Sequence, residues 1–287
     1  MTSRVPVNKT YKLFINGNFP RSESGKSYSL NLDNNATANI CQSSKKDARD
    51  AVVAARSAFP GWSSSTAMLR GQILYRIAEM LEGRKGQFIE EIIMQGVSPK
   101  AAEAEVMASI DCLIHYAGWS DKYQQIFSSV NPVASKHFNF SVPKPTGVVG
   151  IVVVQESALL GLVSMLAPII VGGNTCVLIP SYAKPMSAIT FAEVLNTSDV
   201  PPGVVNIITG DHEVLAPVLA SHMDVNALIA SISNNSLKKA LQISSAENMK
   251  RVIFLDPIDW LDKDESQSPY FIMNAQEIQT TWHPIGN

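Results

Sequence analysis

The feature that most constrains the fold is a regular alternation of short apolar runs and helical segments between Val148 and Leu255. The first run, Val148 to Val154, consists mostly of β-branched residues, which is typical of a strand buried on both faces. Similar runs recur with helical periodicity between them, and this pattern predicts an α/β fold with a doubly wound parallel sheet. The expected strands are 148–154, 175–179, 204–208, 227–231 and 251–255, and the expected helices are 159–171, 187–195, 215–221 and 236–244.

The segment before this core reads as short strands and then helices. Alternating residues over 11–15, followed by Asn16-Gly17, predict a strand and a tight turn. Periodicity predicts three helices, over 44–59, 69–82 and 99–117, and we expect Pro60-Gly61 to end the first. Cys112 and His115 lie in the third helix without a second ligand at helical spacing, so we interpret them as packing residues.

Two further stretches show strand-like alternation. In His137–Val142, Phe138 and Phe140 fall on one side, and we expect the prolines at 143 and 145 to break the strand. Residues 256–269 read as a polar, acidic linker. Strand-like alternation then returns over 270–273 and 277–282.

Charge and cysteine content exclude several classes of protein. The 287 residues include 23 Lys and Arg and 25 Asp and Glu, a net charge of −2, which argues against nucleic-acid binding. Three cysteines at unrelated spacings indicate neither a disulfide framework nor a zinc motif. The first residues lack an apolar core of signal-peptide length, and Gln155, Glu156 and Ser157 interrupt the longest apolar stretch. We therefore expect a cytoplasmic protein with no metal site and no membrane association.

Several motifs together point to one family. Residues 147–210 contain GVVGI, LAPIIVGGNTCVLIPS and VPPGVVNIITG, and the N-terminal part contains LFINGNF, AARSAFPGW and HYAGWSDK. From about residue 11 to about residue 251, these motifs follow in the same order as in the aldehyde dehydrogenase superfamily, which the chain resembles. The resemblance implies a Rossmann-like cofactor domain, a catalytic lobe and a small antiparallel oligomerisation element. It also implies NAD(P)-dependent chemistry with a cysteine nucleophile, an oxyanion hole and a general base.

The same match to the family pattern indicates that the family's catalytic residues are replaced in this chain. The family has Pro-Trp-Asn after the first core strand, and its Asn donates to the oxyanion; here those positions are Val154, Gln155 and Glu156. An ionised carboxylate cannot donate that bond, and its charge opposes an oxyanion. The family's general base, in Glu-Leu-Gly-Gly, corresponds to Leu255. No cysteine follows Cys176, whereas the nucleophile lies in the later catalytic lobe.

The cofactor positions are replaced as well. The family's Lys and Glu that hold the adenosine ribose correspond to Ile179 and Tyr182. The glycine of its Phe-Thr-Gly-Ser turn corresponds to Ile232, whose branched side chain stands where backbone must approach the cofactor. No Gly-x-Gly-x-x-Gly fingerprint follows any expected strand. We therefore expect no bound NAD or NADP.

The resemblance to the family pattern leaves no segment for the catalytic lobe, as expected if an internal deletion had removed it. The expected organisation is N-terminal strands and helices (8–134), an oligomerisation hairpin (135–147), a Rossmann-like core (148–256), a linker in place of the lobe (257–269) and an oligomerisation strand (270–287). A core without its lobe would leave apolar surface exposed, which typically marks a partner surface.

The leading hypothesis is a pseudoenzyme, a non-catalytic structural or regulatory subunit of a full-length aldehyde dehydrogenase, with a homo-oligomer as the other possible assembly. An unpaired strand edge of the oligomerisation element favours pairing with another chain. We expect no catalytic residues, no cofactor-binding residues and no metal ligands. Phe138, Phe140 and Trp282 are the expected interface anchors.

Other functions remain open at this stage. One is the NAD(P)-dependent aldehyde oxidation that the family implies, and another is nucleotide binding without catalysis at the switch point of the sheet. A third is altered chemistry, for which Glu156, His212 and His222 are the acid–base candidates, with Ser157 beside Glu156 as a nucleophile. Adjacent residues rarely face one another, so we do not favour that pair, and we interpret both histidines as loop residues.

Overall fold

A five-stranded parallel sheet lies at the centre of the molecule, in the order β10-β9-β6-β7-β8. The computed structural model describes residues 9–32, 36–255 and 257–286. The sheet confirms the predicted α/β class, and each of its strands lies within a predicted run. They are β6 (Val148–Val152), β7 (Thr175–Ile179), β8 (Val205–Ile207), β9 (Ala227–Ala230) and β10 (Arg251–Phe254).

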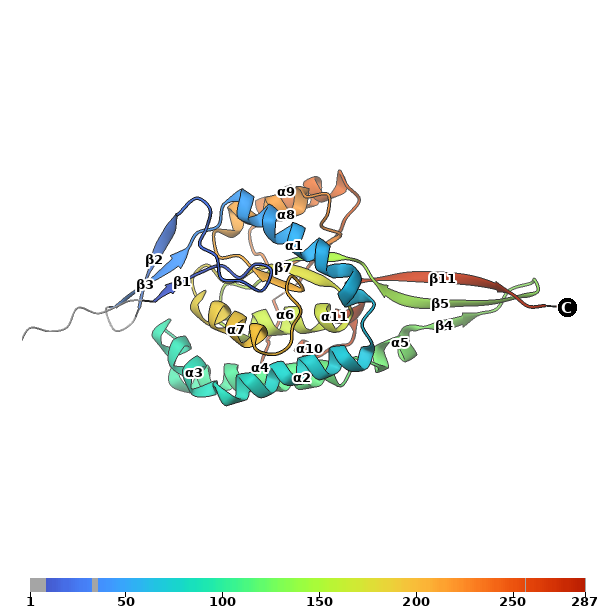
Figure 1. Cartoon of the computed structure of the whole chain (residues 1–287), viewed down its shortest axis with the longest axis horizontal. Coiled ribbons are helices and arrows are strands. Elements are labelled where there is room, and N and C mark those ends of the chain that lie inside the picture. Colours follow the sequence, from blue (N-terminus) through green and yellow to red (C-terminus); the bar gives the residue numbers. More distant parts are fainter. Residues whose placement is uncertain (1–8, 33–35, 256, 287) are drawn as a thin grey trace, which may run out of the picture.

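Helices cover both faces of this sheet (Figure 1). Helices α1, α8 and α9 pack on one face, whereas α6 and α7 pack on the other, with α2 to α5 outside them. These helices are α1 (Lys45–Ser63), α2 (Ala67–Gly83), α3 (Lys85–Met94), α4 (Pro99–Ala117), α5 (Lys122–Phe127), α6 (Leu160–Val171), α7 (Met186–Asn196), α8 (His212–Ser221) and α9 (Asn235–Ala246).

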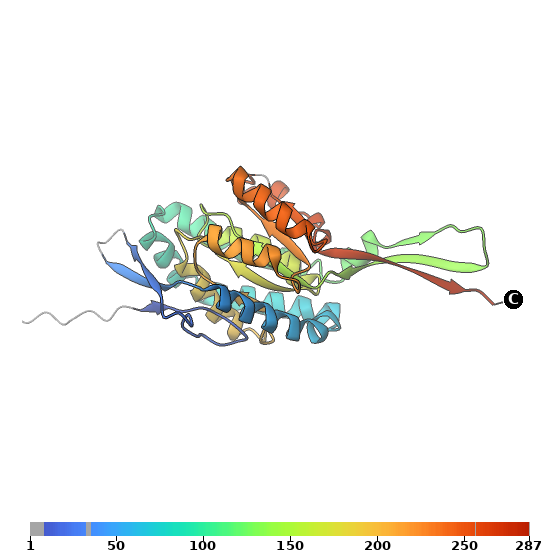
Figure 2. The ribbon, with the colours of Figure 1, turned by 90° about the horizontal axis from the view of Figure 1, so that it is seen from above.

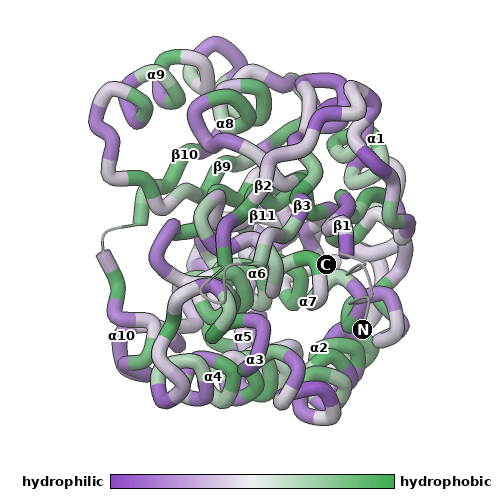
Figure 3. Tube along the Cα trace, turned by 90° about the vertical axis from the view of Figure 1, so that its left-hand side faces the viewer, coloured by the Kyte–Doolittle hydropathy of each residue, from purple (hydrophilic) through white to green (hydrophobic). Residues whose placement is uncertain are grey.

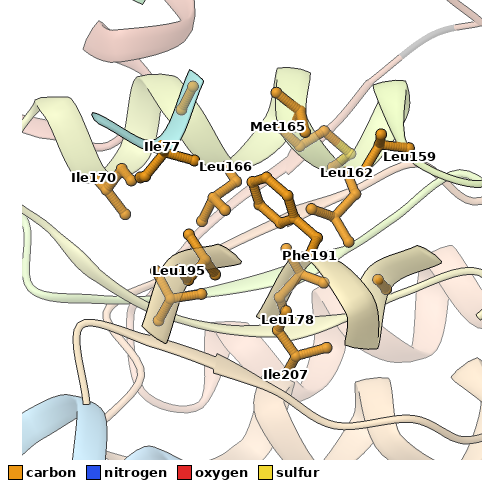
Figure 4. Close-up of a cluster of buried hydrophobic side chains, with 14 of the residues drawn as sticks. Ile77, Leu159, Leu162, Met165, Leu166, Ile170, Leu178, Phe191, Leu195 and Ile207 are labelled. Atoms are coloured by element: carbon orange, nitrogen blue, oxygen red, sulfur yellow. The ribbon is translucent and has the colours of Figure 1, made fainter. Parts of the chain in front are cut away.

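The main core lies between α6, α7 and the sheet. Phe191 of α7 points toward Leu166 of α6, and Leu178 and Ile207 of the sheet lie beneath it (Figure 4). All twelve residues of α6 are buried, which explains why its sequence is apolar on every side. Coloured by hydropathy, α6 is mainly hydrophobic, whereas the outer helices α4 and α9 alternate between hydrophobic and hydrophilic turns (Figure 3).

The N-terminal residues form a small three-stranded sheet at one end of the body (Figure 1). The predicted Asn16-Gly17 turn is present, with φ of 51° and 73°, values that Asn and Gly tolerate better than other residues. Phe14 forms an isolated bridge with Ile207, which covers the β8 edge of the central sheet. The three strands are β1 (Thr10–Tyr11), β2 (Ser27–Asn31) and β3 (Thr37–Cys41).

The helical prediction differs from the structure in several details, among them the short helix α5, which was not predicted. Helix α1 continues through Pro60 to Ser63, because the buried Trp62 indole donates to the Ile170 carbonyl at 3.0 Å and holds the last turn in place. The prediction also missed α3, which follows α2 after one residue and buries Phe88 and Ile92.

Three antiparallel strands form an arm that projects from the body (Figures 1 and 2). Strand β5 runs through Pro143 and Pro145, contrary to the prediction, because only β11 pairs with it there and one edge of the strand is open. The arm also begins earlier than the predicted hairpin, with β4. Its strands are β4 (Ser129–Asn131), β5 (His137–Pro145) and β11 (Gln276–Pro284).

Residues 257–275 pack back onto the body. Tyr270–Met273 forms helix α11, not the predicted strand, and α10 (Lys263–Ser266) lies within the predicted linker. Ile272 and Ala275 are fully buried in the main core, and the Tyr116 hydroxyl donates to the Ser268 carbonyl at 3.1 Å. The prediction that the core exposes apolar surface is therefore wrong for α6, because residues 257–275 cover this helix.

The expected boundaries at residues 8, 256 and 287 lie outside the described residues. Within the described ranges, no helix is long and apolar enough to cross a bilayer. The same ranges contain no group of three or more His, Cys, Asp or Glu placed to hold a metal ion.

Candidate functional site

The loops after the central strands meet at the carboxyl edge of the sheet. This is the topological switch point, because β7 lies on one side of β6 and β9 on the other. A cavity of about 490 Å³ opens there. The residues that follow β6, β7, β9 and β10 line this cavity, together with the first residues of α8 and α9. The lining residues are 154–156, 182, 211–213, 231–234, 237, 238, 255 and 257.

Gln155 and His212 pack together in this cavity. The Gln155 amide nitrogen lies 2.6 Å from Nδ1 of His212, and Nε2 of the imidazole lies 2.8 Å from the Pro180 carbonyl. A carbonyl only accepts, so Nε2 carries the proton and Nδ1 accepts from Gln155. His212 is 8% exposed, and burial lowers its pKa, partly offset by the Pro180 hydrogen bond. It is the first residue of α8, so the interpretation of His212 as a loop residue was wrong.

Ile179 and Tyr182, which by resemblance stand where the family binds the ribose, both have packed side chains. Ile179 is fully buried, so its side chain faces the interior of the fold. Tyr182 stacks on Tyr28 of β2 with ring centroids 4.5 Å apart, and the Tyr28 hydroxyl donates to the Tyr182 carbonyl at 3.2 Å. The Tyr182 amide donates to Oε1 of Gln155 at 2.9 Å, which fixes the orientation of that side chain.

The protein's own side chains occupy the helix N-termini at this edge. Asp211 accepts from the Glu213 amide at 2.9 Å at the start of α8. Asn234 accepts from the amides of residues 236 and 237 at the start of α9. At α6, Oε1 of Glu105 accepts from the Leu159 and Leu160 amides at 2.7 and 3.0 Å. These amides are the groups that would otherwise bind a phosphate.

The acid–base candidates do not form a catalytic pair. Glu156 is exposed, and the Ser157 hydroxyl donates to Glu105 at 2.6 Å rather than to Glu156. His222 follows the last residue of α8, on a separate surface from the cavity. Leu255 and Ile232 supply apolar lining to the cavity.

The three cysteines are buried and unpaired. Burial raises the pKa of the Cys112 and Cys176 thiols to about 12, which disfavours a thiolate at neutral pH. Cys41 belongs to β3 and is 3% exposed. None of the three lines the cavity at the switch point.

The expected interface residues lie on both faces of the arm. Phe138 and Phe140 share one face, with ring centroids 5.5 Å apart, beside a shallow hollow of about 280 Å³. Trp282 pairs with Asn139 across the strands, so it lies on the opposite face, where it contacts His137. Phe138 and Trp282 are 45% and 58% exposed.

Comparison with known proteins places these features in a family. The sequence profile of the aldehyde dehydrogenase family matches residues 22–255. The chain belongs to the aldehyde dehydrogenase family. It is 31% identical over 259 residues to omega-crystallin of Enteroctopus dofleini, and 33% identical over 260 residues to cytosolic 10-formyltetrahydrofolate dehydrogenase of Xenopus laevis. These alignments cover 87% and 88% of this chain, but only 51% and 28% of the two relatives.

Solved aldehyde dehydrogenases have the same fold. A point mutant of an aldehyde dehydrogenase from Bacillus cereus superposes with a TM-score of 0.81 at 26% identity. HpcC from Thermus thermophilus gives 0.80 at 28% identity. The superpositions cover 86% of this chain and 50% and 48% of the two structures. The chain thus spans about half of the structures that it matches.

The cofactor implied by the family does not fit the residues at the switch point. A dinucleotide needs polar partners for its ribose and free amides for its pyrophosphate. Here the ribose positions are a buried Ile179 and a stacked Tyr182, and Asn234 already occupies the amides at the start of α9. The sequence analysis missed the Gln155–His212 contact and the Glu105 cap, because each joins segments more than 50 residues apart.

Proposed function

We propose that this chain is a non-catalytic structural or regulatory subunit of a full-length aldehyde dehydrogenase. The observation that carries the proposal is the chemistry at the switch point. Leu255 stands at the position of the family's general base, Glu156 at that of the oxyanion donor, and the described cysteines are buried away from the cavity. A site with these groups lacks the family's cysteine nucleophile and has an apolar side chain in place of its general base, and it carries a carboxylate at the position of the oxyanion donor.

The connection between β10 and β11 supports an internal deletion. Only residues 255–275 join the two strands, at the place where the family, by resemblance, inserts its catalytic lobe. This segment packs onto α6, so the core closes without a lobe. The partner contact in this proposal therefore rests on the arm and not on an exposed face of the core.

The arm has the properties of a strand-pairing surface. Eight of the nine residues of β11 are at least partly exposed, and β11 is the outer strand, so one row of its backbone groups is open for pairing. Phe138 and Trp282 supply exposed aromatic rings on opposite faces, and the partly exposed Phe140 lies beside Phe138; aromatic rings are typical anchors of protein interfaces. A chain without a catalytic lobe lacks the corresponding acceptor sheet, so we favour a hetero-oligomer over a homo-oligomer.

Co-expression with a full-length aldehyde dehydrogenase of the same organism tests this proposal. We expect one complex of fixed stoichiometry by size-exclusion chromatography with light scattering. The double variant Phe138→Ser/Phe140→Ser should disrupt it, whereas Tyr75→Ser, at an exposed aromatic on α2, should not. Failure to form a complex, or a stable complex with residues 276–287 deleted, would contradict the proposed mode of assembly.

A nucleotide-binding module without catalysis is the second candidate, and the 490 Å³ cavity at the switch point favours it. Thermal shift with NAD and NADP separates the two functions. Binding with a dissociation constant of about 0.1 mM would stabilise the fold by about 1.4 kcal/mol at about 1 mM cofactor. The subunit proposal predicts no shift, and a shift that saturates with either nucleotide would favour the nucleotide-binding module. We also propose a cytoplasmic location, since unpaired cysteines are typical of a reducing compartment.

A further inference from the structure

A second cavity, of about 440 Å³, lies next to the first, between α4, the start of α6 and residues 257–261. Val154, Glu156, Ser231 and Pro257 line both cavities, so the two meet at the switch point. The outer wall comes from the segment that joins β10 to β11. The remaining lining residues are Val97, Ala101, Glu105, Ser157, Leu160, Lys184, Ile258, Asp259, Trp260 and Leu261.

The walls of this cavity are mainly apolar. Leu160 of α6 forms one side, and Trp260 and Leu261 of the connecting segment form another. Trp260 is held in place by packing against the main core, with its ring 6.4 Å from that of Phe271. Pockets of this size with apolar walls and a few charged groups are typical of sites for small organic molecules.

The charged groups define the kind of ligand. Three carboxylates, of Glu105, Glu156 and Asp259, line the cavity, against one ammonium group, of Lys184. The Lys184 ammonium already donates to the Glu156 carbonyl at 2.6 Å. Oε1 of Glu105 accepts from the two amides at the start of α6. A cation is therefore favoured over an anion in this cavity.

We propose that this cavity binds a primary amine with an apolar body of about six to ten carbon atoms. The hydrocarbon part packs against Leu160, Trp260 and Leu261, and the ammonium group lies toward the carboxylates of Glu105 and Glu156. Binding of this kind does not depend on the proposed subunit function, because none of these residues belongs to the arm.

Isothermal titration calorimetry of the full chain with three probes of one chain length tests the ligand class. The probes are 1-aminooctane, 1-octanol and octanoate, each below its micellar concentration. We expect the amine to bind with a dissociation constant below about 1 mM, the alcohol at least about tenfold more weakly, and octanoate not measurably. Octanoate binding as tightly as the amine, or no binding of the amine up to about 5 mM, would overturn the proposal.

Point variants of the full chain test where the amine binds. Ala101→Phe fills the cavity from α4 and should abolish amine binding, whereas Ala134→Phe, an exposed position near the tip of the arm, should leave it unchanged. Glu156→Gln keeps the side-chain shape and should weaken the amine about three- to tenfold without affecting the alcohol. Circular dichroism confirms that each variant is folded. Unchanged amine binding by a folded Ala101→Phe protein would place the ligand elsewhere and refute the assignment.

Discussion

Replacing Glu105 by Ala should destabilise the protein by removing the cap of the most deeply buried helix. Oε1 of this carboxylate accepts three hydrogen bonds, from the Ser157 hydroxyl at 2.6 Å and from the Leu159 and Leu160 amides at 2.7 and 3.0 Å. The N-cap residue Leu159 offers no side-chain acceptor, and the Ser157 hydroxyl accepts from the Gly161 amide rather than from these two amides. The carboxylate also lies at the positive end of the helix dipole.

The magnitude follows from these contacts. Loss of an N-cap costs about 1 kcal/mol, and a buried donor left without an acceptor costs about 1–3 kcal/mol. The neighbouring cavity admits water, which can reach one of the freed groups, so we expect a total loss of about 2–4 kcal/mol. Glu105→Gln retains an oxygen at the same position but not the charge, and should lose only about 1 kcal/mol.

Urea unfolding monitored by circular dichroism measures these differences. The matched control is Glu103→Ala, which removes an exposed carboxylate from the same helix and should change stability by less than about 0.5 kcal/mol. A loss below about 1 kcal/mol for Glu105→Ala would refute the capping role. Equal losses for Glu105→Ala and Glu105→Gln would show that the retained oxygen contributes nothing.

Three other predictions concern buried polar groups. The Lys250 ammonium donates to three carbonyls at the end of α8, at 2.8–3.0 Å, so Lys250→Met should cost about 2–3 kcal/mol in urea unfolding, whereas Lys239→Met, on the surface, should cost under about 0.5 kcal/mol. Burial raises the pKa of Glu91, whose Oε1 accepts from two buried hydroxyls, so the folded state holds this proton more tightly. The protonated Glu91 carboxyl contributes its full stabilisation below the unfolded pKa of about 4.3, and this contribution is lost as the pH rises through the folded pKa. The free energy of unfolding of Glu91→Gln should therefore increase relative to that of the wild type between about pH 4.5 and 7.5. A difference between the two proteins that stays constant over this pH range would contradict the prediction. Burial and the raised thiol pKa values of Cys112 and Cys176 predict slow labelling by a maleimide in the native protein and three labelled thiols in urea; rapid native labelling of either residue would refute the burial argument.

The central sheet and its helices could be predicted because most residues of its strands are apolar. Strands β6 and β7 are buried along their whole length, so the runs Val148–Val152 and Cys176–Ile179 stand out in the sequence. The prediction failed where tertiary contacts decide the local structure. Tyr270–Met273 alternates like a strand, but Ile272 enters the core and makes the segment helical.

For the candidate site, the sequence allowed predictions about single residues but not about their contacts with one another. The resemblance to the family predicts that Glu156 and Leu255 replace catalytic residues, because each follows its strand at the expected distance, and this stays a prediction. What fills the cavity could not be predicted, since Gln155 and His212 come from different loops and nothing in either local sequence indicates the other. The cover of α6 was also missed, because neither the polar linker around Trp260 nor the strand-like segment around Ile272 indicated that these side chains pack inward.

Affinity capture of this chain from extracts of its own cells, followed by native mass spectrometry, tests the subunit proposal most directly. We expect that a longer aldehyde dehydrogenase is captured in a fixed ratio and that the double variant Phe138→Ser/Phe140→Ser fails to capture it. Capture of this chain only as a homo-oligomer of defined size, with no longer aldehyde dehydrogenase present, would refute the subunit proposal.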